Sequence, residues 1–231
     1  AALGSNQPVR VDSLAVTDGH GVPLRAKPAA IVSQPAAGTI GTMCPETPTG
    51  VAYVAYPSCH LVAGIDLSSG TVVTGIQLDA NGMPTILQPG SDGAIALSCP
   101  DECSGGGTIT DGARPTSLDL QLDESTGRRT LAIGAENSNV VTIADLDINS
   151  HPASTSTVAL QNTTGTLGVN QVKVSPTIGM GGVNGQGIND SATAPGGLMQ
   201  FLYAITSDAT IRVANIHNSV NQECDTQVDP R

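Results

Sequence analysis

The sequence is short of aromatic and charged residues. It has no Trp, one Phe and three Tyr, and charged residues make up 13% of it. With so few rings, the core must be built from Val, Ile, Leu and Ala, a composition that suits stacked β-sheets. The shortage also argues against a sugar-processing enzyme, because ligand pockets are commonly lined by aromatic side chains.

Positive charge is scarce as well. Lys and Arg total 9 against 20 Asp and Glu, which gives a formal net charge of −11. A chain this acidic lacks the electrostatic footprint that nucleic acids require, and anionic membranes would repel it. No apolar run approaches the roughly 18 residues of a membrane-spanning helix, and residues 1–6 lack the features of a signal peptide. We therefore expect no nucleic-acid partner and no transmembrane segment.

Turn-forming residues, by contrast, are abundant: the 27 Gly and 15 Pro divide the chain into short segments. Between them lie runs rich in β-branched residues, which predict strands. The clearest is the hairpin 129–146, in which Leu131–Ile133 and Val140–Ile143 flank the polar turn 136–139. Further strands are expected at 9–16, 22–32, 50–56, 61–67, 71–78, 85–87, 94–97, 115–122, 154–160, 169–174, 200–206 and 210–216.

These strands group into three similar units, at about 40–79, 113–160 and 165–217, with insertions at about 80–112 and 179–197. If Tyr53, Leu131 and Tyr203 are taken as equivalent, the units are 78 and 72 residues apart. Ordinary propeller repeats run about 40 to 50 residues. Either long insertions separate the units, or a degenerate unit lies between each pair.

The first two units carry a recognisable pattern. It comprises Tyr53-Val54-Ala55, Ile65-Asp66-Leu67, Ser69-Gly70 and Val72-Val73, and it recurs in residues 139–146. This pattern resembles the YVTN-type β-propeller repeat of bacterial surface and periplasmic proteins. The third unit departs from it, with Asn215 at the Asp position. The resemblance implies an all-β fold: a β-propeller, or part of one, built from antiparallel meander blades with long loop insertions, in a single domain over residues 1–231.

A propeller closes with at least about four blades. Three units and an N-terminal hairpin barely reach that number, so we expect a second polypeptide or a lost C-terminal part to complete the ring. The terminal Arg231 is what trypsin-like cleavage leaves.

Five cysteines in a chain rich in Ser, Thr, Asn and Gly indicate export. We favour the disulfides Cys99–Cys103 and Cys44–Cys59, although four cysteines allow three pairings. Cys224 is the odd one, and either joins another chain or stays a free thiol. The cysteines and the four histidines lack the spacing of a zinc site.

Carboxylates offer the remaining candidates for chemistry. Asp145, Asp147 and Asn149 alternate along the chain as calcium ligands do, but they lack the glycine and closing glutamate of an EF-hand; no other cofactor is expected. The pairs Asp145/Asp147 and Asp123/Glu124 could act as acid and base only if they converge in a cleft. For Asp66 and Asp145 we expect the capping of turns.

The favoured function is that of a non-enzymatic, exported β-propeller, which acts as a protein-binding or assembly subunit of the cell envelope. It would be periplasmic, outer-membrane-associated or extracellular, and loops 99–103 and 179–197 would contact a protein partner. The first alternative is a propeller-type lyase or glycan-active enzyme that uses channel carboxylates. The second alternative is a β-sandwich adhesin.

Overall fold

The computed structural model describes residues 21, 26–33, 50–95, 112–123, 127–161, 167–179, 198–217 and 222–224. Apart from short 3-10 turns such as Pro57–Cys59, the regular structure in these residues is β-strand. In this part of the chain, no helix has the length and the apolar character that a membrane crossing requires.

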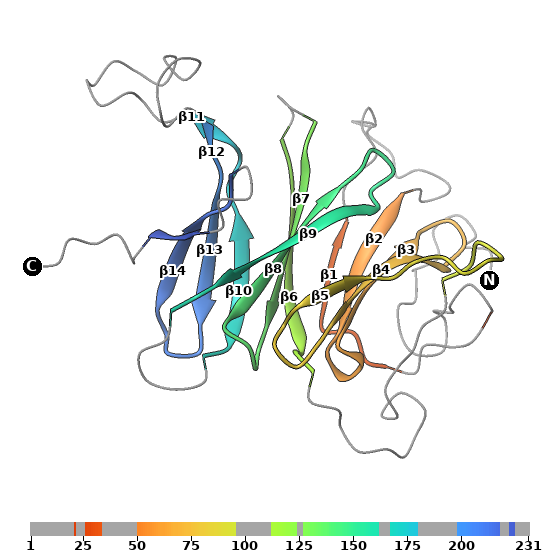
Figure 1. Cartoon of the computed structure of the whole chain (residues 1–231), viewed down its shortest axis with the longest axis horizontal. Coiled ribbons are helices and arrows are strands. Elements are labelled where there is room, and N and C mark those ends of the chain that lie inside the picture. The colour runs from red at the N-terminus through yellow and green to blue at the C-terminus, as the bar shows by residue number, and fades with distance from the viewer. Residues whose placement is uncertain are drawn as a thin grey trace, which may run out of the picture.

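The strands form three antiparallel meander sheets (Figure 1). The first sheet contains β1 (Ala30–Ser33), β2 (Val51–Tyr56), β3 (Leu61–Asp66), β4 (Val72–Leu78) and β5 (Pro84–Ile86). The second contains β6 (Pro115–Leu122), β7 (Arg129–Ala135), β8 (Val140–Leu146) and β9 (Pro152–Ala159). The third contains β10 (Val169–Val174), β13 (Phe201–Thr206), β14 (Ile211–Asn215) and β15 (Gln222–Glu223). A small hairpin of β11 (Ile178–Gly179) and β12 (Leu198–Met199) is inserted between β10 and β13.

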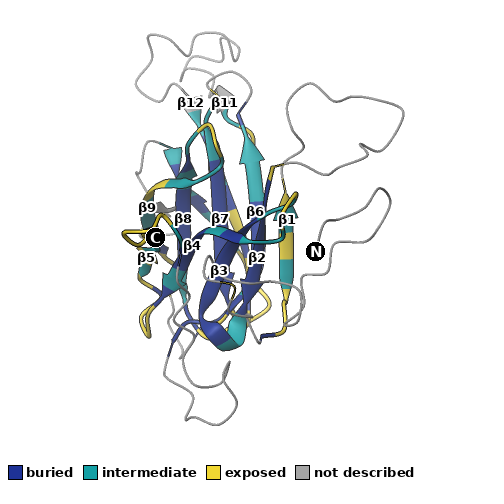
Figure 2. Cartoon of the chain, turned by 90° about the vertical axis from the view of Figure 1, so that its right-hand side faces the viewer, coloured by how far each residue is buried: buried dark blue, intermediate teal, exposed yellow. Residues whose placement is uncertain are grey.

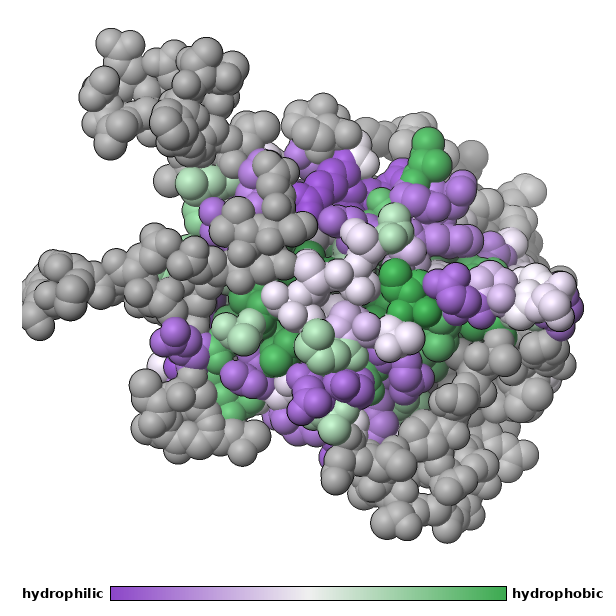
Figure 3. Space-filling view, viewed as in Figure 1, coloured by the Kyte–Doolittle hydropathy of each residue, from purple (hydrophilic) through white to green (hydrophobic). Residues whose placement is uncertain are grey.

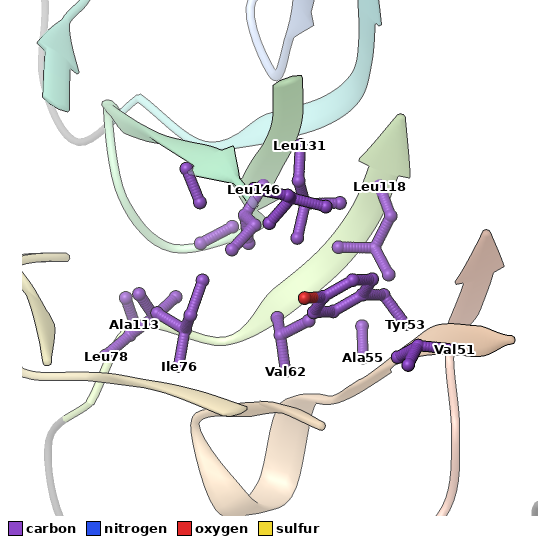
Figure 4. Close-up of a cluster of buried hydrophobic side chains, with 13 residues drawn as sticks. Val51, Tyr53, Ala55, Val62, Ile76, Leu78, Ala113, Leu118, Leu131 and Leu146 are labelled. Carbon is purple, nitrogen blue, oxygen red and sulfur yellow. The ribbon is translucent and has the colours of Figure 1, made fainter. Parts of the chain in front are cut away.

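Figure 1 shows the three sheets side by side in chain order, with the first sheet on the right and the third on the left. Two apolar layers join them. Tyr53, Val62 and Ile76 of the first sheet meet Leu118 and Leu131 of the second sheet (Figure 4). The other face of the second sheet packs on the third sheet through a layer formed by Ala132, Ile143, Val158, Val172, Leu202, Ala204 and Ala214, among others.

The second sheet is therefore covered on both faces, and its sequence reflects this. In β7, Leu131 and Ile133 face the first sheet while Ala132 faces the third, and all three are at most 1% exposed. Strands buried on both faces have near-continuous apolar runs in place of an alternation with polar residues. Figure 2 shows β2, β3, β7 and β8 buried along most of their length.

Small and polar side chains set how closely the second and third sheets approach. A Cβ added to Gly134 would lie 2.7 Å from a methyl group of Val169, so only glycine fits this position without movement. Nearby, Ser117 Oγ accepts a hydrogen bond from Val172 N at 2.9 Å, and Asp119 Oδ2 accepts one from Val174 N at 2.7 Å. β13 pairs with one edge of β10, and these two bonds use backbone N–H groups on the other, outer edge of β10.

The outer strand of the second sheet, β9, has a different character. It carries the Ser/Thr-rich run 154–157, which is exposed or half-buried. In Figure 3 it accounts for pale, weakly polar side chains that cross the middle of the molecule, where β9 runs in Figure 1.

The all-β prediction is confirmed, and the strand predictions at 115–122 and 169–174 match β6 and β10 at both ends. The predicted insertion 80–112 contains β5, which pairs with β4, so this part of it belongs to the first sheet. The strand expected at 94–97 is wrong for 94 and 95, because Asp92 Oδ1 accepts a bond from Ala94 N and closes a turn there. Residues 96–97 and the strand predicted at 9–16 lie outside the described residues.

Of the strand predicted at 22–32, residues 30–32 lie in β1 at the edge of the first sheet, residues 26–29 are not strand, and residues 22–25 lie outside the described residues. Within the described ranges the three sheets stand in a row and do not close into a ring. A two-sheet sandwich does not describe them either, since the second sheet is covered on both faces.

Candidate functional site: the open face of the third sheet

Among the described residues, no other element covers one face of the third sheet. Strand register places its residues: Tyr203 pairs with Lys173 and Val213, and Ile205 pairs with Gln171 and Ile211. Cross-strand partners point to the same side of a sheet. We call this surface the open face, and it consists of Gln171, Lys173, Phe201, Tyr203, Ile205, Ile211, Val213 and Asn215.

The open face exposes large apolar side chains. Tyr203 is 41% exposed, Ile205 40% and Ile211 67%, whereas Leu202 and Ala204 on the opposite face are fully buried. These three make up half of the exposed large hydrophobic residues in the described parts of the chain, and the others are scattered. Single exposed apolar residues are ordinary on a protein surface, but a contiguous group of them marks an interaction site.

The sheets can be aligned by the Asp or Asn that lies at or next to the end of their third strand. Asp66 pairs with Val51 in the first sheet, Asp145 with Thr130 in the second, and Asn215 with Phe201 in the third. Counting two residues onward makes Tyr53, Ala132 and Tyr203 equivalent. The predicted equivalence of Leu131 is therefore wrong by one residue, and a shift of one residue moves a side chain to the opposite face.

With this alignment, the open face can be compared with the equivalent faces of the first two sheets. Tyr53 is fully buried against the second sheet, as Figure 4 shows, and Ala132 is fully buried against the third. Their neighbours on the same faces, Val62 and Ile143, are at most 2% exposed. The open face is thus the third member of a series, and in the first two members the next sheet covers the same positions.

The charge on the open face also differs from that of the whole chain. Lys173 lies on it, and its ammonium forms an ion pair with Asp119 of the second sheet. None of the described positions that make up the face is Asp or Glu, although the chain has a net charge of −11. The open face is therefore largely apolar, and its one charged side chain, Lys173, is paired with Asp119.

The predicted calcium ligands lie in and before the turn that joins β8 and β9. Asp145 pairs with the guanidinium of Arg128 at 2.7 Å. Asp147 Oδ1 accepts bonds from the backbone N–H groups of Asn149 and His151, both at 2.8 Å. Asp145 Oδ1 and Asp147 Oδ1 are thus engaged by protein donors. Calcium binding by these residues stays a prediction.

Turn capping by Asp66 is confirmed. Its Oδ1 accepts bonds from the backbone N–H groups of Ser68 and Ser69 at 3.1 and 2.8 Å. Partial burial acts to raise the pKa of Asp66, but these bonds and those from the two serine hydroxyls outweigh it and hold the pKa below its usual value. The same prediction for Asp145 is wrong: it forms an ion pair, and Asp147 caps the turn instead.

Cys59 is fully buried and disulfide-bonded. Its predicted partner Cys44 lies outside the described residues, as do Cys99 and Cys103, so the two pairings stay predictions. Cys224 is a half-buried thiol.

The described histidines lie in different surroundings. His60 is buried, with Nδ1 3.2 Å from the carbonyl oxygen of Ala113. Burial and the charge of Arg128 lower the pKa of His217, and Asp123 partly opposes this. His20 and Glu124 lie outside the described residues. Among the residues that the structure describes, no three His, Cys, Asp or Glu side chains form a metal-binding group.

The predicted contact loop 99–103 also lies outside the described residues, as does loop 179–197 except for Gly179, which ends β11. Sequence reasoning missed the open face. The sequence signal that could have found it is the run Phe201–Thr206, in which both faces of the strand carry apolar side chains. No protein-family model matches the chain, and no curated protein matches it in sequence.

Proposed function

We propose that this chain is a non-enzymatic assembly module of the cell envelope, that it forms part of a β-propeller, and that it binds a protein partner through the open face. One observation carries the proposal. Tyr203, Ile205 and Ile211 are exposed at positions whose equivalents in the first two sheets are buried by a neighbouring sheet.

The energetics favour coverage of this face. Full burial of a large apolar side chain contributes about 1.5–3 kcal/mol. Because Tyr203, Ile205 and Ile211 are 40–67% exposed, covering them would contribute about 1 kcal/mol each. Such a group near the centre of an interface is typical of residues that dominate binding.

Two further observations support a binding role in an exported protein. The disulfide of Cys59 suits an oxidising compartment. Of the carboxylates considered for acid–base chemistry, Asp145 pairs with Arg128, and Asp147 accepts two backbone N–H bonds of its own turn. The enzyme alternative therefore gains no support from the described residues.

The test compares the complexes formed by the full, disulfide-bonded chain and its variants in the source cells. We expect the native chain to sediment as a complex heavier than one chain. The double variant Ile205→Lys, Ile211→Lys should release that complex, because it places two charges on the open face. The matched control Ala153→Lys, Ala159→Lys changes exposed positions of β9 and should retain the complex. A chain that sediments alone, or a complex that tolerates the double variant, would show that the proposal is wrong.

A further inference from the structure

We propose that the open face receives a four-stranded antiparallel sheet of a separate polypeptide, and that the hydroxyl of Tyr203 donates a hydrogen bond to a backbone carbonyl in a turn of that sheet. The inference rests on the proposed function, because it names the occupant of the same face and one contact that holds it.

Tyr53 provides the template within this chain. Its ring lies between the first and second sheets, and its hydroxyl donates to the backbone carbonyl of Ser150, which is 97 residues away in sequence. A buried phenol usually requires such an acceptor, since an unpaired hydroxyl in an apolar layer is costly. Burial, together with the charge of Asp147, raises the pKa of Tyr53 well above its ordinary value, which keeps the hydroxyl protonated as a donor.

The turn that receives Tyr53 is held rigidly. Asp147 Oδ1 binds the N–H groups of Asn149 and His151. The guanidinium of Arg129 donates to the carbonyl oxygens of Asp147 and Ile148 at 2.9 and 2.7 Å. Ser150 itself has a φ of 62°, in the left-handed region. These contacts fix the third-to-fourth-strand turn, so that the Ser150 carbonyl meets the Tyr53 hydroxyl of the preceding sheet.

Tyr203 has the position and the chemistry to repeat this contact. It lies on the strand equivalent to β2 and in the same register as Tyr53, and it points away from the second sheet. Its apolar neighbours Ile205, Ile211 and Val213 correspond to positions that the second sheet covers around Tyr53. A fitting partner would present what the second sheet presents to the first, namely a layer of Leu, Ile and Ala side chains, as formed by Leu118, Leu131, Ile133 and Ala144.

A second copy of this chain fits less well than a different polypeptide. Each sheet has a forward face, which carries Tyr53 or its equivalent, and a backward face on the other side. In both internal interfaces, the forward face of one sheet packs against the backward face of the next sheet. In a second copy, the backward face of the first sheet is already buried, since Ala52, Val54 and Tyr56 on it are fully covered. Two open faces against each other would bring together two chains of net charge −11.

The first experiment locates the contact. The photoreactive amino acid p-benzoyl-phenylalanine replaces Tyr203 in one version of the full chain and Ala159, an exposed residue of β9, in the other. Cross-linked peptides are then mapped by mass spectrometry. We expect position 203 to react with the turn between the third and fourth strands of a sheet in another polypeptide, and position 159 to give no such product. A product with a second copy of this chain would overturn the inference.

The second experiment isolates the hydroxyl, with the purified partner chain found by cross-linking as the probe. Tyr203→Phe retains the ring and should weaken binding about tenfold, the effect of one hydrogen bond lost from an interface. Ile205→Lys should abolish binding. If Tyr203→Phe binds as tightly as the native chain while Ile205→Lys does not bind, the hydroxyl contact is wrong and the proposed function stands. If Ile205→Lys also binds normally, both are wrong.

Discussion

Two tyrosines in equivalent positions allow a direct test of which faces of this molecule are covered. Tyr53 is fully buried between the first and second sheets, whereas Tyr203 is 41% exposed on the open face. We expect Tyr53→Ala to destabilise the isolated chain strongly and Tyr203→Ala to destabilise it weakly. The two substitutions remove the same atoms, so the difference reports the environment alone.

The magnitudes follow from burial. Replacing a buried aromatic residue by Ala typically costs about 3–5 kcal/mol, and Tyr53→Ala also leaves the Ser150 carbonyl without its donor. For the partly exposed Tyr203 we expect about 1 kcal/mol. With a urea m-value of about 2 kcal/mol/M, the midpoint of unfolding should fall by about 2 M and 0.5 M, respectively.

Unfolding in urea should be followed by far-UV circular dichroism, since the chain has no Trp. If Tyr53→Ala does not fold, Tyr53→Phe provides the test: it should cost about 1 kcal/mol through the lost hydrogen bond, and Tyr203→Phe should cost less than about 0.5 kcal/mol. Equal destabilisation at the two positions would refute the reasoning, because it would mean that Tyr203 is covered in the isolated chain.

Three further outcomes are expected. Asp119→Ala should destabilise the chain by about 1–3 kcal/mol in urea titrations, since it leaves a buried backbone donor unpaired, whereas Glu136→Ala, which breaks an exposed ion pair, should change stability by less than about 0.5 kcal/mol. Gly134→Ala should cost about 1–3 kcal/mol, because its Cβ would press on the third sheet; a thermal scan that shows no loss would contradict the close approach. The pKa of His217 is lowered in the folded chain from 6.5. The unfolded chain therefore binds the proton more readily, and stability should fall as the pH drops through 6.5. His217→Gln should reduce this loss between about pH 7 and pH 5, and an unchanged pH profile would show that another group titrates there.

The parts of the fold that follow local rules could be predicted from the sequence. The start of β6 at Pro115 and the limits of β10 coincide with changes from turn residues to runs that carry Leu or Val at spaced positions. Residues 94 and 95 resembled a strand, but the carboxylate of Asp92 competes for the backbone and makes a turn. Local side-chain hydrogen bonds of this kind are not visible in a pattern of apolar residues.

Properties that depend on pairing between strands could not be predicted in the same way. The alignment of Leu131 with the two tyrosines was wrong by one residue, because register is set by cross-strand hydrogen bonds that the sequence does not display. The open face illustrates the same limit. The runs 51–56 and 201–206 have similar apolar patterns, yet one strand is covered on both faces and the other on one. Whether another sheet covers a face of a strand depends on how the sheets assemble, and the sequence of the strand alone does not show it.

The bonds from Ser117 and Asp119 to the outer edge of β10 have a consequence for how this protein can grow into a larger structure. The N–H groups of Val172 and Val174, which an invading strand would use, are already taken. At this edge, the addition of a further strand by backbone hydrogen bonds, as in fibril formation, is blocked. The adjacent open face stays available for another sheet to pack on it. The arrangement therefore favours association of whole sheets through the open face over pairing of single strands at this edge.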